Sequence, residues 1–177
     1  MEIEIRAEID NGTKLTNFLK KMDGVSFMGT DKEDDRYFKH GTDIDRKLVF
    51  RIRRKGGKAM LTLKGKATGK DTAWADVDLP LDDPKTLEGL FSSNNYIEVV
   101  RIQKTRSMFK KGTFEINVDK IEGLGWFVEV EGRGTEKGRA KIEKAIHVIL
   151  DELGIQKEQI IERGYVPLAI ERMAKKS

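Results

Sequence analysis

Charged side chains recur at every second position in several stretches of this sequence, and most of these stretches carry one sign of charge. In the first, MEIEIRAEI, an extended backbone puts Glu2, Glu4 and Arg6 on one face and isoleucines on the other, because successive side chains of a strand point to opposite sides. Carboxylates recur at Asp76, Asp78, Asp119, Glu129 and Glu131. Basic side chains recur at Arg51, Arg53, Lys64, Lys104 and Arg106. Grouped carboxylates suit hard divalent cations, and grouped arginines and lysines suit phosphate.

The two signs of charge are nearly balanced over the chain. Its 177 residues include 34 Lys and Arg and 30 Asp and Glu, which gives a net charge of +4. A nucleic-acid-binding protein usually has a clearer basic excess, so we expect no nucleic-acid partner. A triphosphate bound together with a divalent metal needs both signs, since the anion binds Lys and Arg while the cation binds carboxylates.

Composition excludes several other classes of protein. The chain has no cysteine, which rules out a disulfide framework, a thiolate metal site and a cysteine nucleophile. No apolar run reaches the roughly 18 residues of a membrane-spanning helix. The acidic start at Glu2 and Glu4 is unlike the basic and then apolar start of a secretory signal. We therefore expect a cytoplasmic protein that does not associate with membranes.

The charged positions lie in stretches that have the two-residue period of strands. The predicted strands are Ile3–Ile9, Asp35–His40, Lys47–Arg54, Ala59–Lys66, Thr72–Leu79, Tyr96–Met108, Gly112–Lys120 and Trp126–Gly132. The predicted helices are Thr13–Met22, Pro84–Ser92, Glu136–Leu153 and Val166–Ala174. Strands in close succession, several joined by glycine turns, indicate an antiparallel sheet in an α+β protein. The length suits a single domain over residues 1–177.

Two arrangements of such a sheet satisfy the alternation. In a sandwich the apolar faces meet and the charges face water, which is the usual outcome. In a closed barrel the charged faces look inward and helices cover part of the apolar outside, which is rare because buried charges are costly unless they pair or bind ions. Spacing alone leaves both open. The separation of acidic from basic strands favours the barrel, because it would build an anionic and a cationic wall.

A series of short motifs shares its order with a known family. The motifs are Glu2-Ile3-Glu4-Ile5-Arg6, DRYF (Asp35–Phe38), RIRR (Arg51–Arg54), TLKGK (Thr62–Lys66), the pair Asp76 and Asp78, KTR (Lys104–Arg106) and NVDKIEGLGWFVEVE (Asn117–Glu131). Together they resemble the CYTH superfamily, named for class IV adenylate cyclases and thiamine triphosphatase and also called triphosphate tunnel metalloenzymes. The likeness covers nearly the whole chain, and its last motif is closest to the class IV cyclase branch.

The resemblance implies an eight-stranded antiparallel barrel, a tunnel with a polar, charged interior, flanked by helices. It implies divalent-metal ligands at Glu2, Glu4, Asp119, Glu129 and Glu131. It implies phosphate-binding residues at Arg6, Arg51, Arg53, Lys64, Lys104 and Arg106. By the same likeness Glu2, Glu4, Arg6 and Asp119 are the candidate catalytic residues.

Some positions depart from the family pattern or support it only weakly. Arg6 stands where the family usually has Lys, so a planar fork replaces a compact ammonium. Asp76 and Asp78 stand where the longer Glu is commoner, which suits a supporting role. His40 at a strand end and Tyr165 near a tunnel mouth are further candidates for support.

The resemblance implies an enzyme that uses Mg²⁺ or Mn²⁺ and acts on a small-molecule triphosphate. The first hypothesis is a class IV adenylate cyclase type that converts ATP to cyclic AMP and pyrophosphate. The alternatives are a hydrolase of inorganic tripolyphosphate or thiamine triphosphate, and a non-catalytic module that binds polyphosphate or nucleotide. The motifs do not decide among these three, and they leave a homodimer open.

Overall fold

The computed structural model describes residues 2–43, 48–66, 74–161 and 163–174. The strands are β1 (Glu2–Ile9), β2 (Val25–His40), β3 (Leu48–Lys55), β4 (Lys58–Lys66), β5 (Trp74–Pro80), β6 (Tyr96–Lys111), β7 (Phe114–Ile121), β8 (Gly125–Arg133) and β9 (Ile160–Ile161). The helices are α1 (Gly12–Leu19), α2 (Pro84–Ser93), α3 (Arg139–Glu152) and α4 (Tyr165–Ala174). None of the helices in these described ranges is long and apolar enough to cross a membrane.

The strands form one sheet in the hydrogen-bonded order β5-β4-β3-β2-β6-β7-β8-β1-β9. The pairs β1–β8, β2–β3, β3–β4, β4–β5, β6–β7 and β7–β8 are all antiparallel. The predicted α+β class with an antiparallel sheet is therefore confirmed. Within the described residues the sheet has nine strands where eight were predicted, because the short β9 adds to the free edge of β1. The order has two ends, β5 and β9.

The chain divides into two compact units. The first comprises residues 1–31 and 104–168, and the second comprises residues 32–103 and 169–177. The long strands β2 and β6 contribute to both units.

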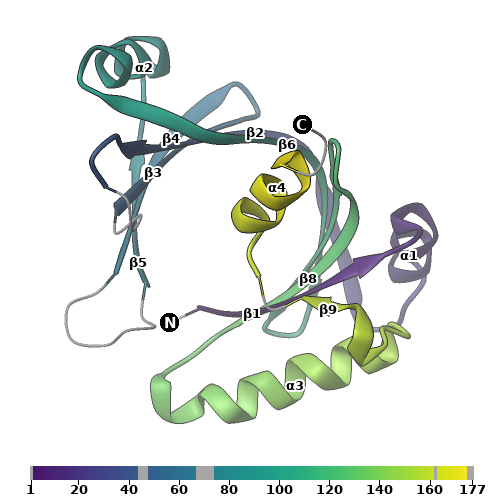
Figure 1. Ribbon diagram of the computed structural model, residues 1–177. Helices are drawn as coiled ribbons and strands as arrows, with labels where there is room; N and C mark the ends of the chain where they lie inside the picture. Colours follow the sequence, from purple (N-terminus) through teal and green to yellow (C-terminus); the bar gives the residue numbers. More distant parts are fainter. Residues whose placement is uncertain (1, 44–47, 67–73, 162, 175–177) are drawn as a thin grey trace. The chain divides into compact units, whose positions relative to one another are not determined.

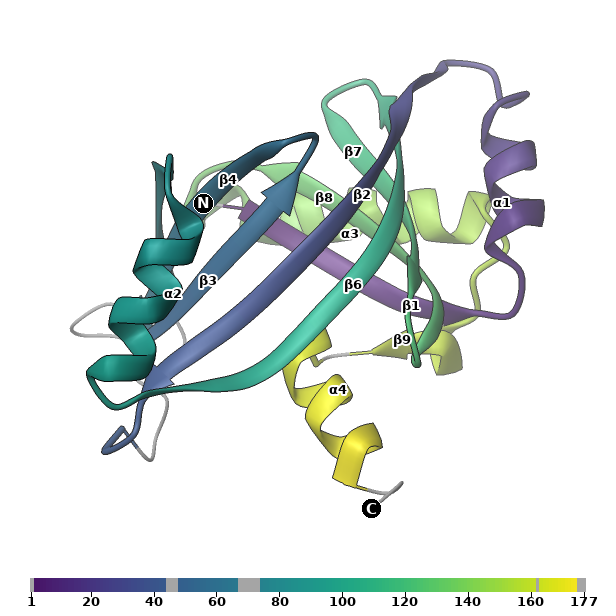
Figure 2. The same cartoon turned by 90° about the horizontal axis from the view of Figure 1, so that it is seen from above.

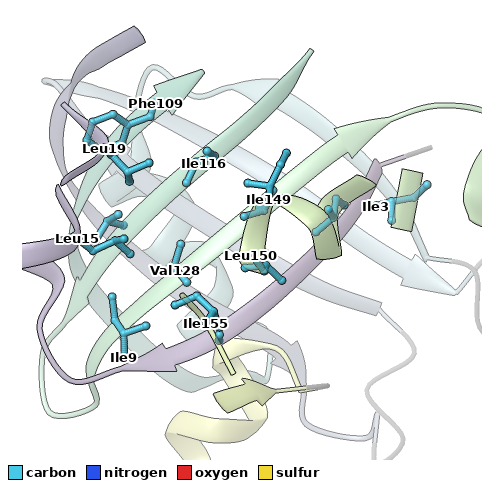
Figure 3. Packing of buried hydrophobic residues seen from close by; sticks show 14 residues of the cluster. Ile3, Ile9, Leu15, Leu19, Phe109, Ile116, Val128, Ile149, Leu150 and Ile155 are labelled. Atoms are coloured by element: carbon cyan, nitrogen blue, oxygen red, sulfur yellow. The ribbon is translucent and has the colours of Figure 1, made fainter. Parts of the chain in front are cut away.

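In the first unit the apolar face of the sheet is covered by helices. Buried side chains of β1, β7 and β8 pack with Leu15 and Leu19 of α1 and with Ile146, Ile149 and Leu150 of α3, and Figure 3 shows this cluster. Figure 1 shows α3 running beneath β1 and β8. These strands therefore turn their apolar side to helices and not to a second sheet, which contradicts the sandwich.

Helix α1 begins one residue before the predicted start. Asn11 is its N-cap, since the side chain accepts a hydrogen bond of 2.9 Å from the Lys14 backbone N–H. Gly12 lies so close to Trp126 that a Cβ on it would meet the indole at 2.0 Å. Glycine is thus needed where the helix starts against β8.

In the second unit α2 covers the apolar face of the neighbouring strands (Figure 2). Phe38, Ile52 and Phe91 are buried together there. The helix starts as its sequence predicts, with Pro84 in the first turn and Asp83 as the N-cap that accepts from the Thr86 N–H at 3.0 Å. On β2 and β3 the side chains alternate, so Arg36 and Arg54 share the face of α2, where both pair with Glu88, whereas Arg51 and Arg53 lie on the other face.

Candidate active site

The register of β1 and β8 groups the charged residues of the first unit. Glu4 lies opposite Glu131 and Arg6 lies opposite Glu129 in the antiparallel pair. Side chains directly opposite each other in such a pair have Cβ atoms about 4.5–5.5 Å apart. The alternation seen in MEIEIR and FVEVE therefore places three carboxylates and one guanidinium on one patch of the sheet.

Three carboxylates of this patch can converge on one ion. Each of Glu4, Glu129 and Glu131 has a carboxylate oxygen within 4.8 Å of the others. Hard cations such as Mg²⁺ and Mn²⁺ prefer such oxygen ligands. The donor set fits a divalent metal of this class. Glu4, Glu129 and Glu131, from the predicted metal set, are thus brought together.

The negative charge of this group is only partly neutralised. Burial, together with the charges of Glu2 and Glu129, raises the pKa of Glu131 to about 8. Burial and the Glu129 carboxylate also raise the pKa of Glu4, against the opposing effect of Arg6. A carboxylate that resists ionisation next to others of its kind is stabilised by a bound cation.

Glu129 is held ionised by two arginines. Arg6 Nε donates to Glu129 Oε2 at 2.5 Å, and Arg106 Nη2 donates to Glu129 Oε1 at 3.0 Å. Burial opposes ionisation, but Arg106 and Arg6 outweigh it and lower the pKa of Glu129 to about 2. Arg6 also forms an ion pair with Glu4. The predicted phosphate-binding Arg6 and Arg106 thus contact the predicted metal ligands.

Asp119 lies in a more basic environment and shares Arg106 with Glu129. Arg106 donates to it through Nε at 2.8 Å and Nη2 at 2.6 Å, and Lys104 Nζ lies 3.8 Å from Oδ2. The Tyr165 hydroxyl donates to Asp119 Oδ2 at 3.1 Å, and its ring packs on Phe127 with centroids 5.3 Å apart. Burial raises the pKa of Tyr165, and Glu129 and Asp119 add to this effect. Tyr165 therefore stays a neutral hydrogen-bond donor.

Glu2 is placed apart from the three-carboxylate group. It lies opposite Arg133 in the β1–β8 register, and Arg133 Nη2 is 3.5 Å from its Oε1. Both side chains are exposed. Metal ligation by Glu2 and Asp119 stays a prediction.

The second unit carries the other predicted basic residues. Arg53 donates to Asp35 through two parallel hydrogen bonds of 2.7 and 2.6 Å, and its Nη2 lies 3.3 Å from Glu33. Both carboxylates are almost fully buried. Arg51 Nη2 donates to the Thr62 hydroxyl at 2.8 Å. These arginines lie on the charged face of β3, held there by neighbouring strands.

The remaining predicted residues of this unit have local partners. Asp78 accepts a 2.5 Å hydrogen bond from the Thr62 hydroxyl. Lys64 lies opposite Asp76 in the β4–β5 register, but the side chain of Asp76 lies outside the described residues. His40 Nδ1 lies 2.7 Å from the Thr42 hydroxyl, and the ring packs edge-on against Tyr96.

The opposite face of the same strands carries an exposed ion-pair cluster. Arg101 donates to Asp34 through two hydrogen bonds of 2.8 Å, and Arg36 pairs with Glu98. Together with Arg54 these residues line a cavity of about 310 Å³. The cluster contacts none of the residues assigned above, and it serves as an exposed reference for the buried pair of Arg53 and Asp35.

Sequence reasoning missed several charged or polar residues on these faces. Glu33 is buried against Arg53 and Lys55, and it was missed because the run DKEDD hides the two-residue period. Glu115 lies opposite Glu131 and Asn117 lies opposite Glu129 in the β7–β8 register. Their alternation with Ile116 and Val118 places them on the face of Asp119, but the motifs gave them no role in the site.

Comparisons with known proteins agree with the motifs. Residues 1–165 match the sequence family described as CYTH domain. The chain is 31% identical over 173 residues to a candidate adenylate cyclase of Methanocaldococcus jannaschii, a match that covers 95% of this chain and 98% of the relative. A protein of Pyrococcus horikoshii has a similar fold, with a TM-score of 0.80, 20% identity and coverage of 95% and 99%. So does a candidate adenylyl cyclase from Hippeastrum, reported with a dominant triphosphatase activity, with a TM-score of 0.67, 17% identity and coverage of 98% and 95%.

Proposed function

This chain belongs to the CYTH domain family, and from this premise we propose that it is a divalent-metal-dependent enzyme that converts ATP to cyclic AMP and pyrophosphate. The relative from Methanocaldococcus jannaschii, named as a candidate adenylate cyclase, supports the choice of reaction. The proposal covers one functional domain over residues 1–177.

One observation carries the proposal. The three carboxylates Glu4, Glu129 and Glu131 lie within 4.8 Å of one another, and Arg6 and Arg106 are in direct contact with this group. A hard-cation site that adjoins guanidinium groups matches the charge pattern of a metal-bound triphosphate. An ordinary surface ion pair would require neither the burial of Glu129 nor the excess of carboxylates.

In this proposal the residues act mainly by position and charge. Glu4, Glu129 and Glu131 hold the metal, with Glu2 and Asp119 nearby in support, and Asp76 and Asp78 as further supports. The bound Mg²⁺ or Mn²⁺ supplies charge neutralisation and orients the triphosphate. The phosphate oxygens are bound by Arg6, Arg51, Arg53, Lys64, Lys104 and Arg106.

The chemical step of the cyclase joins two parts of one substrate. The ribose 3′-oxygen would form a bond to the α-phosphorus while its proton passes to solvent, and the bond from the α-phosphorus to the bridging oxygen would break to release pyrophosphate. Guanidinium groups bind the leaving phosphates through parallel N–H bonds and stabilise the charge that develops on them. Tyr165 fixes the Asp119 carboxylate by its hydrogen bond, which in turn orients Arg106.

Triphosphate hydrolysis is the second candidate. The structurally similar Hippeastrum protein is reported with a dominant triphosphatase activity, and the same arrangement of carboxylates and arginines suits attack of water on the γ-phosphorus. Inorganic tripolyphosphate and thiamine triphosphate are the substrates that this alternative predicts.

The test is an incubation of the protein with ATP, tripolyphosphate or thiamine triphosphate, each with Mg²⁺, Mn²⁺ or EDTA. Cyclic AMP and pyrophosphate from ATP support the cyclase, whereas orthophosphate from any substrate supports the hydrolase. Glu131→Gln should abolish either reaction, while Glu122→Gln, an exposed carboxylate in the β7–β8 turn, should not. Binding of triphosphate without metal-dependent turnover would contradict both and leave the non-catalytic module.

A further inference from the structure

The arginines and carboxylates of the candidate site are each other's partners in this structure. Arg6 contacts Glu129 through Nε at 2.5 Å and Glu4 through Nη2. Arg106 contacts Glu129 at 3.0 Å and Asp119 at 2.6 and 2.8 Å. Both oxygens of Glu129 therefore accept hydrogen bonds from guanidinium groups. The residues proposed for phosphate and those proposed for metal form one ion-pair network.

A metal ion and a phosphate would each compete with the ion pairs that Arg6 forms with Glu4 and Glu129. A cation bound by Glu4 and Glu129 would lie next to the Arg6 guanidinium, and two positive charges at such a distance repel each other. A phosphate bound by Arg6 would withdraw that guanidinium from Glu4 and Glu129, which would then repel each other and Glu131. Either ligand alone thus leaves charges of one sign without their partner.

Arg6 is the residue of this network that must give up its carboxylate partners when the ligands bind. Its carboxylate partners, Glu4 and Glu129, both belong to the three-carboxylate group. Arg106 differs, because its two hydrogen bonds to Asp119 lie outside that group and can persist when a metal binds. The Arg6 side chain is 17% exposed, so it lies at the boundary between the buried network and solvent, where a phosphate can reach it.

We propose that Arg6 couples the two ligands, so that a triphosphate and a divalent cation each raise the affinity of this site for the other. The inference rests on the proposed function and deepens it, since it specifies that the site binds its substrate as the complex of metal and triphosphate. The triphosphate takes Arg6, and the cation takes the place of Arg6 on Glu4 and Glu129. Coupling of this kind between two ligands is typically about 5- to 150-fold and is reciprocal.

Removing the Arg6 charge isolates this coupling from the direct attraction of metal for phosphate. In Arg6→Gln the carboxylates Glu4 and Glu129 lose a competing cation, so the metal alone should bind roughly 10-fold more tightly. The triphosphate alone should bind roughly 10-fold more weakly, because a charged hydrogen-bond donor is lost. The mutual enhancement should fall about 10-fold or more. A merely structural role of Arg6 would weaken both ligands together.

The experiment is calorimetric titration of the full chain. Mn²⁺ is titrated alone, and an ATP analogue with methylene groups at both bridging positions is titrated alone in EDTA, since it can be neither cyclised nor hydrolysed. Each is then titrated into protein saturated with the other, with correction for the complex that Mn²⁺ and the analogue form in solution. Arg139→Gln is the matched control, because it removes the same charge from an exposed pair with Glu143 on α3.

Arg6→Lys is the second variant, because it keeps the charge but loses the planar fork that reaches both carboxylates. It should fold and show Mn²⁺ affinity between those of wild type and Arg6→Gln. Tighter Mn²⁺ binding in Arg6→Gln, with unchanged binding in Arg139→Gln, supports the proposal. Equal or weaker Mn²⁺ binding in a folded Arg6→Gln overturns the coupling and leaves the proposed function standing. An absence of Mn²⁺ binding in wild type, with and without the analogue, overturns both.

Discussion

Two glutamates on β8 should respond in opposite directions to the same substitution. Glu129 and Glu131 share one face of the strand, and both belong to the candidate metal group. Glu129 is neutralised by Arg106 and Arg6, whereas Glu131 faces the charges of Glu2 and Glu129. In metal-free protein at pH 8 we expect Glu129→Gln to destabilise the fold and Glu131→Gln to stabilise it.

The magnitudes follow from the two pKa shifts. For Glu129 the pKa falls from 4.5 to about 2, which at about 1.36 kcal/mol per unit corresponds to a loss of about 3 kcal/mol in the variant. For Glu131 the pKa rises from 4.5 to about 8, which is at most about 5 kcal/mol on the same scale. Because Glu131 is only half-buried, solvent screening reduces its effect to roughly 1–2 kcal/mol.

The two effects belong to different pH ranges. The pKa of Glu131 is raised on folding, so the wild-type protein loses stability as the pH rises from about 4.5 to about 8, and Glu131→Gln removes that loss. The pKa of Glu129 is lowered, so its contribution is present above about 4.5 and is lost as the pH falls towards 2. The benefit of Glu131→Gln should therefore vanish near pH 4.5, where the penalty of Glu129→Gln persists.

The assay is thermal unfolding in EDTA between pH 4 and about 8.5. A change of 1 kcal/mol shifts the Tm of a domain of this size by about 2–4 °C, so at pH 8 we expect about +2 to +8 °C for Glu131→Gln and roughly −6 to −12 °C for Glu129→Gln. Glu122→Gln is the exposed control and should change little. Equal signs for the two variants, or a benefit of Glu131→Gln that does not depend on pH, would refute the electrostatic description of the site.

Three further predictions concern other contacts. Arg53→Ala removes the guanidinium that pairs with buried Asp35, while Glu33 keeps Lys55, and should cost about 3–5 kcal/mol in urea unfolding. Arg101→Ala, which breaks an exposed pair with similar geometry, should cost below about 1 kcal/mol. Arg53→Ala should also weaken triphosphate binding in calorimetry by roughly 10- to 100-fold. A loss of similar size for a monophosphate would argue against a set of basic side chains that binds several phosphates at once. Tyr165→Phe removes one hydrogen bond to Asp119 and should cost about 1 kcal/mol; no change in Tm would show that this bond contributes nothing.

Most of the fold was predictable because its strands alternate cleanly. Phe114–Ile121 and Gly125–Arg133 differ by at most two residues at either end from the predicted strands, since each turns one apolar and one charged face. Strand β2 is 16 residues long and starts at Val25, ten residues before the predicted start. Its first half, VSFMGTDK, has apolar and polar residues on both faces and is largely exposed, so no clean alternation marked it. Strand β9 has only two residues, which is too short for any period.

The candidate site was predictable as a set of residues but not as a set of contacts. Alternation alone assigns Glu4, Glu129 and Glu131 to one face, and the register of β1 with β8 then brings them together. Which arginine would pair with which carboxylate depends on long side chains that reach across strands far apart in sequence. The contact of Arg106 on β6 with Glu129 on β8, which reaches past the intervening β7, is such a case.

The edge of β1 also sets the order in which the site can form during synthesis. Arg6 pairs with Glu129 on one side, 123 residues downstream, and with Ile161 on the other. The Gln159 side chain donates to the Glu8 carbonyl at 3.1 Å, which adds a further link between the start of the chain and this late segment. A nascent chain therefore exposes β1 as an unpaired strand until its late partners leave the ribosome, and closing loops of this length slows folding. The alternating glutamates and Arg6 place charges along β1 while it is unpaired, and charged side chains on an unpaired strand discourage pairing with other chains. The residues proposed for metal and phosphate would thus also protect the strand before it is paired.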